Sequence, residues 1–338
     1  MSGFGTEIGK HALAAAAGAV VLAAVAAGPA VAATTLKVST CLVKNDDQSE
    51  VFLDLFFNKV NAAKAGVRLR YIGGPEAIPR KKQHIALQRK LVDIIFCPSS
   101  YYGGKVPEAR VTAVSNVSPD ELRANGAYDI LQKAWAKGLN ARILGWAFWG
   151  GTEFHIYTTF KPKLSDKTGL DLSGVKMRST GLYNPFFRVM GAVPVNISAT
   201  EVYTALERGV VKGLAYPIGA VSKYGWQRFI RYRVSPAFFR SSSMAVINLD
   251  KFNALAKSDR DLLVKAGIEF ERKSGPALRK RATRDTEKLF AAGVKEITLT
   301  GNVAKAYLGT IYGAKWADNA KYSYIIPFEK LKALMYKQ

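Results

Sequence analysis

Residues 176–217 read KMRSTGLYNPFFRVMGAVPVNISATEVYTALERGVVKGLAYP, a pattern of two short strands that alternate with two amphipathic helices. The first strand ends in a basic residue, Arg178. Ser198 and Glu201 have the spacing of a capping box and predict a helix over residues 202–208. Glu201 therefore has a structural explanation, and we interpret it as a helix cap and not as a catalytic acid.

The residues before this stretch predict an α/β lobe. Strand-like runs alternate with helical patterns: strands over 35–41, 67–72 and 92–97, helices over 48–63 and 79–90. This alternation implies parallel strands. Ligands of such sheets lie beyond the carboxyl ends of the strands. We therefore expect the loops 44–47, 73–78 and 98–104 to face a site.

The length after residue 33 is about twice that of a typical domain, so we expect two α/β lobes. Lobe I is predicted over 34–152 plus 242–281 and lobe II over 153–241 plus 282–338. Hinge strands should join them, together with a long helical pattern over 251–291. Gly275 and Pro276 interrupt this pattern, and the proline predicts a bend.

The chain begins with the features of a secretory signal peptide over residues 1–33. Lys10 and His11 precede an apolar run over 12–27, and small residues end the segment at Ala33. A membrane anchor is the alternative, but the run is rich in alanine and at the short end for a bilayer span. We expect cleavage after Ala33 and an exported, soluble chain.

The formal net charge of +23 arises from 49 basic and 26 acidic residues. Such a surplus suits nucleic acid, an anionic membrane or anionic small molecules. The basic residues are dispersed, and together with export this argues against nucleic acid. A basic solvated surface and electrostatic steering of an anionic ligand both stay open.

Two cysteines, Cys41 and Cys97, each lie near the end of a strand-like run. An oxidising compartment would permit a disulfide. The sequence does not bring the two sites together, and we therefore favour two buried free thiols.

Motifs for catalysis or metal binding are sparse. The sequence has no HExxH, GxSxG, P-loop or Cys/His metal spacing, and we expect no cofactor, no metal and no enzymatic activity. An exported two-lobed enzyme acting on a small anionic substrate is the alternative. It would need a titratable pair, for which only His155 with Glu153 or Glu76 is available.

Arg178 is the main candidate for binding an anion, because the planar guanidinium matches the two oxygens of a carboxylate. From its spacing alone, however, an ordinary surface arginine is the favoured interpretation. Aromatic residues near glycines on strand-end loops, Tyr101 and Trp149, are candidates for the walls of a ligand site.

The segment Asp171-Leu172-Ser173-Gly174-Val175-Lys176-Met177-Arg178 resembles the pattern D-L-x-G-x-K-x-R of the DctP-like solute-binding proteins of tripartite ATP-independent periplasmic (TRAP) transporters. The resemblance continues over residues 190–195, 201–206 and 209–211. It implies a periplasmic-binding-protein-like fold that closes over an organic acid. It also implies a periplasmic location, TRAP permease subunits as partners, and a salt bridge from Arg178 to the carboxylate of the ligand.

The chain departs from this family pattern at three positions. Lys212 stands where the family usually has an acidic residue, and Tyr216 where an asparagine often contacts the ligand. A second ligand-binding arginine of some members falls at His155, whose charge near neutral pH is conditional. With Trp149 and Tyr101, these changes favour a monocarboxylate with an apolar or aromatic body.

The sequence thus predicts a monomeric periplasmic receptor that captures a small carboxylate by lobe closure and delivers it to a TRAP permease. The predicted ligand-binding residues are Arg178, His155, Tyr216, Tyr101, Trp149 and Glu76.

Overall fold

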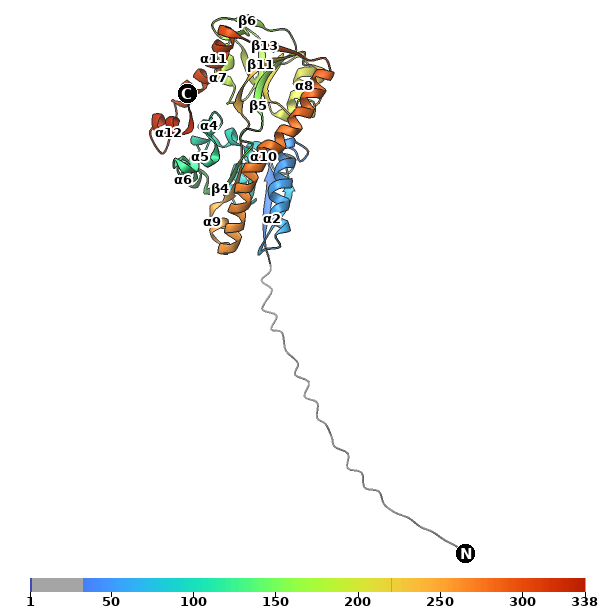
Figure 1. Cartoon of the computed structure of the whole chain (residues 1–338), viewed down its shortest axis with the longest axis vertical. Coiled ribbons are helices and arrows are strands. Elements are labelled where there is room, and N and C mark those ends of the chain that lie inside the picture. The colour runs from blue at the N-terminus through green and yellow to red at the C-terminus, as the bar shows by residue number, and fades with distance from the viewer. Residues whose placement is uncertain (2–32, 220, 338) are drawn as a thin grey trace. The chain divides into compact units, whose positions relative to one another are not determined.

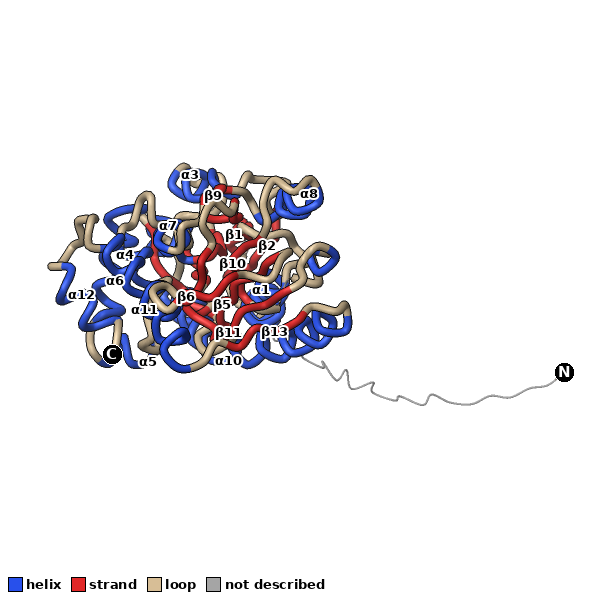
Figure 2. Tube along the Cα trace, turned by 90° about the horizontal axis from the view of Figure 1, so that it is seen from above, coloured by secondary structure: helices blue, strands red, loops and turns tan. Residues whose placement is uncertain are grey.

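The computed structural model describes Met1, residues 33–219 and residues 221–337, and it contains two large β-sheets flanked by helices and a small two-stranded sheet (Figures 1 and 2). The predicted signal peptide lies outside the described residues except for its two ends. Within the described part of the chain, no helix combines the length and the apolar character needed to cross a bilayer.

The first sheet has five strands in the order β2-β1-β3-β12-β4. We call this sheet and its helices lobe I. β1 is parallel to β2 and β3, whereas β12 is antiparallel to both β3 and β4. The strands are β1 (Thr34–Thr40), β2 (Val67–Gly73), β3 (Ile94–Pro98), β4 (Ala141–Ala147) and β12 (Ser243–Asn248). The helices include α1 (Asp47–Phe52), α2 (Asn58–Ala62), α3 (Gln83–Gln88), α4 (Glu108–Thr112), α5 (Pro119–Ala124), α6 (Ala127–Leu139) and α9 (Leu249–Asn253).

The second sheet has six strands in the order β13-β11-β5-β10-β8-β9, and with its helices we call it lobe II. The strands are β5 (Glu153–Thr158), β8 (Lys176–Ser179), β9 (Val193–Asn196), β10 (Gly213–Pro217), β11 (Tyr232–Arg240) and β13 (Lys295–Thr298). The helices include α7 (Asn184–Val189), α8 (Val202–Glu207) and α11 (Gly301–Asn319), and a small hairpin joins β6 (Lys163–Ser165) to β7 (Gly169–Asp171). The last helix, α12 (Phe328–Met335), packs against α4 and α6 of lobe I. The Ser198–Glu201 capping box precedes α8 and confirms the interpretation of Glu201.

β11 is absent from the sequence-based prediction. Pro236 lies inside it, and a proline usually argues against a strand because it cannot donate to the ladder. Here the register between β11 and β5 shifts between Val234 and Phe238, so the proline occupies an irregular part of the strand.

The chain passes between the lobes from β4 to β5 and again from β11 to β12, and α10 (Lys257–Ala291) runs along both (Figure 1). α10 continues through Pro276 and does not stop there. It supports the first crossing directly, because the Ser274 hydroxyl oxygen accepts a 2.8 Å hydrogen bond from the Phe148 N–H. Gly275 allows the close approach, since a Cβ there would lie 2.3 Å from the Trp149 carbonyl oxygen.

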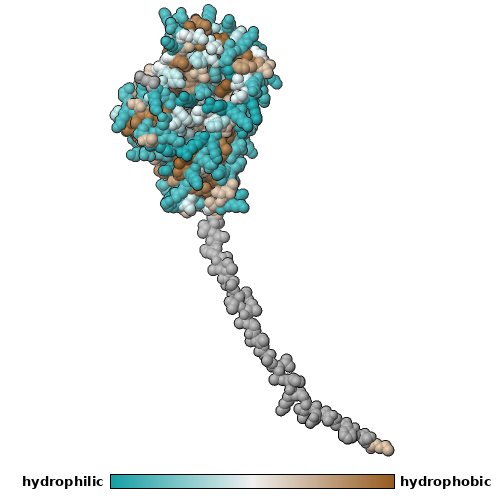
Figure 3. Space-filling view, viewed as in Figure 1, coloured by the Kyte–Doolittle hydropathy of each residue, from teal (hydrophilic) through white to brown (hydrophobic). Residues whose placement is uncertain are grey.

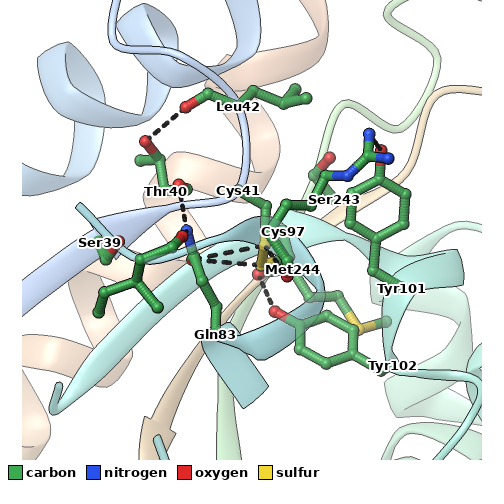
Figure 4. Close-up of a disulfide and its surroundings, with 12 residues drawn as sticks. Ser39, Thr40, Cys41, Leu42, Gln83, Cys97, Tyr101, Tyr102, Ser243 and Met244 are labelled. Atoms are coloured by element: carbon green, nitrogen blue, oxygen red, sulfur yellow. Dashed lines mark hydrogen bonds between the residues drawn. A yellow bond between two sulfur atoms is a disulfide. The ribbon is translucent and has the colours of Figure 1, made fainter. Parts of the chain in front are cut away.

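Cys41 and Cys97 form a disulfide, which contradicts the expectation of two free thiols (Figure 4). β1 and β3 are adjacent parallel strands in which Thr40 is in register with Phe96. The residues that follow this pair are therefore neighbours, with Cα atoms 4.9 Å apart. The bridge joins the carboxyl ends of two lobe I strands, where their loops begin.

The surface shown in Figure 3 is mostly hydrophilic, with small apolar areas between the polar side chains. The predicted lobe boundaries, 34–152 plus 242–281 and 153–241 plus 282–338, stay a prediction.

Candidate functional site

A cavity of about 50 Å³ lies between the lobes, where β3, β8 and β10 reach their carboxyl ends. Its walls come from lobe I, lobe II and the crossing after β11. They comprise Leu42, Gln48, Pro98, Ser99, Ser100, Tyr101, Ala113, Phe154, Arg178, Thr180, Leu182, Tyr183, Tyr216, Pro217, Arg240, Ser241 and Ser242. The volume is well below the roughly 300–1,000 Å³ of typical ligand pockets. Even a small organic molecule must therefore enter while the lobes are further apart.

Arg178 is buried in the wall of this cavity, with 1% of its surface exposed. It lies on β8, in register with Leu214 of β10 and Val195 of β9. Its Nε donates a 3.0 Å hydrogen bond to the Ile197 carbonyl oxygen, which fixes the plane of the guanidinium. Among residues 33–219 and 221–337, Nη1 has no hydrogen-bond partner and no acidic side chain forms an ion pair with this arginine.

An unpaired cation in a buried position is costly, and buried charges in proteins are normally paired. The free edge of the Arg178 guanidinium therefore has the chemistry of a binding site for an anion. A carboxylate accepts from such an edge through its two oxygens.

Tyr216 lies on β10, with its ring 5.7 Å from the guanidinium carbon of Arg178. Burial raises the pKa of its phenol well above the ordinary value, so the group stays neutral. Burial also raises the pKa of Tyr183, another residue of the cavity wall. Both phenols can therefore donate a hydrogen bond to an anion without adding negative charge.

Tyr101 and Thr180 line both the cavity and a second groove of about 580 Å³, which therefore lies next to it. The Tyr101 side chain is also held by Arg80. Its hydroxyl accepts a 2.9 Å hydrogen bond from Arg80 Nη1. The Arg80 guanidinium carbon also lies 5.0 Å from the centre of the Tyr101 ring. Arg80 and Lys81 make this side of the groove basic, whereas burial lowers the pKa of the neighbouring His84.

Three predicted ligand residues do not line the cavity. His155 lies directly opposite Tyr216 in the ladder, but its Nδ1 is 2.9 Å from the Val234 carbonyl oxygen. Burial lowers the pKa of His155 to about 4, so the ring is neutral near pH 7 and donates to this carbonyl. Its polar edge is thus used within the sheet.

Glu76 accepts a 2.6 Å hydrogen bond from the Gly74 N–H within its own loop. Trp149 stands behind the cavity wall, with its ring 4.7 Å from the guanidinium carbon of Arg240. Its role is therefore to support a neighbouring residue of the wall.

Arg240 is a charged residue of the wall that the sequence analysis did not predict. It ends β11, immediately before the second crossing between the lobes. The signal was available, because Arg240 follows Phe238 and Phe239 as Arg178 follows Met177, a basic residue at the end of an apolar strand.

A cluster of polar contacts, which we call the clasp, joins the lobes beside the cavity. It consists of Asp46, Asp47 and Glu50 from lobe I, and Lys223 and Tyr224 from lobe II. Lys223 Nζ donates to Asp47 at 2.9 Å and to Glu50 at 3.2 Å. The Tyr224 hydroxyl donates to Asp46 Oδ2 at 2.8 Å. Burial raises the pKa of Asp46 to about 6, although hydrogen bonds from Gln48 and Tyr224 oppose this.

The part of the chain that the structure describes contains no group of three or more His, Cys, Asp or Glu side chains placed to hold a metal ion.

These features define a two-lobed receptor with a buried, unpaired arginine facing the space between its lobes. The family model DctP, bacterial extracellular solute-binding protein family 7, matches residues 60–308. The chain belongs to this family, whose members are extracytoplasmic solute receptors of TRAP transporters.

Two curated relatives are binding proteins of small solutes. A solute-binding protein of Verminephrobacter eiseniae is 24% identical over 289 residues, which is 82% of each chain. The 2,3-diketo-L-gulonate-binding periplasmic protein YiaO of Escherichia coli is 28% identical over 217 residues, 61% of this chain and 63% of that protein.

Solved structures share the fold. An extracytoplasmic solute receptor of Bordetella pertussis that binds pyroglutamic acid has a TM-score of 0.77 at 19% identity, over 90% of this chain and 99% of that chain. A TRAP periplasmic solute-binding protein of Rhodoferax ferrireducens with bound malonate has a TM-score of 0.74 at 17% identity, over 89% of this chain and 96% of that chain.

Proposed function

We propose that this protein is a periplasmic receptor that captures an organic acid between its lobes and presents the closed complex to a TRAP-type permease. The observation that carries this proposal is the buried Nη1 of Arg178, which has no partner among the described residues. Membership of this family supports a role of the cavity in transport. The relatives named above support an organic acid as the ligand, since pyroglutamic acid, malonate and 2,3-diketo-L-gulonate all carry a carboxylate.

In this mechanism Arg178 binds the carboxylate on lobe II while the lobes are apart. Tyr216 adds a neutral hydrogen-bond donor, and Tyr101 from lobe I then covers the ligand. A ligand can shift the equilibrium toward the closed state only through contacts that are better in that state. The presence of both lobes in the cavity wall supports such contacts.

The wall of the cavity offers little for catalysis, which supports a receptor over the alternative of an exported enzyme. None of its residues is a histidine, an aspartate or a glutamate. The polar edge of His155, the only candidate for a general base, is directed to the Val234 carbonyl oxygen.

Arg178→Gln tests the proposal, with Arg188→Gln on the exposed face of α7 as the matched control. Binding of a panel of monocarboxylic and dicarboxylic acids would be measured by isothermal titration calorimetry. We expect the wild type and the Arg188 variant to bind the same acids, and the Arg178 variant to lose them. Unchanged affinity in the Arg178 variant, with its melting temperature also unchanged, would refute the assignment.

A further inference from the structure

A groove of about 800 Å³ lies on lobe I, and we call it the α10 groove. Its walls come from the first half of α10, from α9 and from β4, which lie side by side in Figure 1. None of the residues that line it also lines the cavity between the lobes. The α10 groove is therefore a separate feature of the surface, and the organic-acid site does not account for it.

The apolar part of the α10 groove is a short strip. Val264 and Ile268 are four residues apart on α10, and Phe252 comes from α9. Residues four apart on a helix are neighbours on one face. The strip thus matches the spacing of apolar side chains one turn apart on a second helix.

Arg142 on β4 is a cation at this strip. Its guanidinium carbon lies 4.9 Å from the centre of the Phe252 ring. Its Nε is buried and has no hydrogen-bond partner within residues 33–219 and 221–337, and no acid in these ranges forms an ion pair with it. Buried donors and charges in proteins normally have a partner. The arginine is thus held against a ring and left without an anion.

The charge of the α10 groove is positive because its acids are already used. Asp261 and Glu269 are the acidic residues that line it, and each forms a 2.5 Å ion pair with a lysine, Lys257 and Lys273 respectively. A third pair joins Arg272 to Asp120 at 3.3 Å. The lining cations that have no acidic partner in the described part of the chain are Arg142, Arg260 and Lys265.

Side chains close the free edge of β4, the last strand of its sheet. The Ile143 N–H donates to Gln132 Oε1 at 3.0 Å, and Gln132 Nε2 donates to the Ile143 carbonyl oxygen at 2.9 Å. Glu271 accepts a 2.6 Å hydrogen bond from the Trp146 N–H. An open strand edge can accept a further strand, but at these positions the backbone groups are taken. A partner must therefore be recognised by the side chains of the groove.

We propose that the α10 groove binds an acidic amphipathic helix of a partner protein. Two apolar side chains of that helix pack on Val264, Ile268 and Phe252, and carboxylates beside them bind Arg142 and Lys265. An amphipathic helix in a groove is a recurring mode of recognition. The lining part of α10, residues 260–273, is about 20 Å long, which suits a partner helix of about 14 residues. The inference goes beyond the proposed function and does not depend on it.

The test uses three fluorescently labelled helical peptides of about 14 residues that share one stripe of leucine. Their other positions combine alanine with glutamate, with glutamine or with lysine. Binding is followed by fluorescence anisotropy with the wild type, Arg142→Gln, Lys265→Gln and Ile268→Ala. Arg279→Gln is the matched control, because Arg279 is an exposed cation of the same helix that does not line the groove.

We expect the wild type to bind the glutamate peptide at least about tenfold more tightly than the other two. Arg142→Gln should weaken this binding about tenfold, the effect of one lost charge-assisted hydrogen bond. Lys265→Gln should weaken it about threefold, since this charge is exposed, and it keeps the test valid if the Arg142 variant does not fold. Ile268→Ala should weaken the glutamate and glutamine peptides by the same factor. The Arg279 control should change the affinity less than about twofold.

A wild type that does not bind the glutamate peptide would overturn the proposal. Equal losses in the Arg142 and Arg279 variants would do the same, since the peptide would then respond only to the overall charge. Binding to phosphatidylglycerol vesicles in place of the peptide would assign the groove to a membrane. A dimer that Arg142→Gln dissociates would assign it to a second copy of this chain, and both outcomes contradict a partner helix. Organic-acid binding in the cavity should be unchanged in every variant, so failure here leaves the proposed function intact.

Discussion

Asp46 of the clasp should make ligand binding tighter at lower pH, and Asp46→Asn should remove this dependence. Asp46 is 3% exposed and lies on lobe I, whereas Tyr224, which donates a hydrogen bond to its carboxylate, belongs to lobe II. Separation of the lobes would return Asp46 to water and to its ordinary pKa. The pKa of Asp46 is therefore raised only in the closed state.

The magnitude follows from the shift of the Asp46 pKa from 3.8 to about 6. A raised pKa means that the closed state binds a proton more readily than the open state, so closure weakens as the pH rises through the interval between the two values. Each pKa unit is worth about 1.4 kcal/mol, so full ionisation costs the closed state about 3 kcal/mol. When the pH falls from 7.5 to 5.0, protonation of Asp46 stabilises the closed state by about 1.4 kcal/mol, which is about a tenfold gain in ligand affinity.

The assay is calorimetric titration of one bound acid from pH 7.5 to pH 5.0, with a ligand whose own carboxylates stay ionised over this range. Closure can be followed in parallel by the fluorescence of Trp226, whose ring stacks on Tyr224 with centroids 4.8 Å apart. Asp46→Asn mimics the neutral acid and should bind more tightly at pH 7.5, by at most about 100-fold, with a flat pH profile.

Asp166→Asn, at an exposed turn, is the control and should keep the wild-type profile. Wild-type affinity that is constant or falls toward pH 5.0 would refute the reasoning. The same would follow if Asp46→Asn retained the wild-type slope.

Two further predictions concern the scaffold. Replacing Cys41 and Cys97 together by serine should lower the free energy of unfolding by about 4 kcal/mol, the value for a closed loop of this length, and a urea titration would measure it. A loss below about 1 kcal/mol would mean that the bridge adds little. Gly275→Ala should destabilise the protein and weaken binding, because its Cβ would meet the Trp149 carbonyl oxygen at 2.3 Å. Gly309→Ala, in α11 with no atom within 4 Å of the added Cβ, should instead raise the melting temperature slightly, and equal behaviour of the two variants would contradict this explanation.

The sequence was sufficient to predict the strands of lobe I and to select Arg178, which the structure places in the cavity wall. The strands 35–41, 67–72 and 92–97 are regular, and the structure has β1, β2 and β3 within two residues of each predicted end. Arg178 was identifiable because a strand end and a family motif coincide at one residue.

The missed features depend on contacts between distant segments. The disulfide follows from the register of β1 with β3, which neither strand encodes alone. Arg240 follows two apolar residues as Arg178 does, but Pro236 argued against a strand there, so this pattern was not recognised as a strand end. The family resemblance placed a ligand-binding side chain at His155, but in the structure its ring nitrogen is hydrogen-bonded to the backbone carbonyl of Val234 in β11, 79 residues later.

The position of β12 has a consequence for the order in which the chain can fold. β12 lies between β3 and β4 in lobe I, yet it follows all of β5, β8, β9, β10 and β11 in sequence. A chain that emerges from its amino end therefore exposes the unpaired edges of β3 and β4 until Asn248 has appeared. Such edges are prone to pair with other chains. Because lobe II is synthesised first, the pairing of β12 with β3 and β4 is a late step that joins segments far apart in the sequence. We expect the chain to depend most on chaperones before this step.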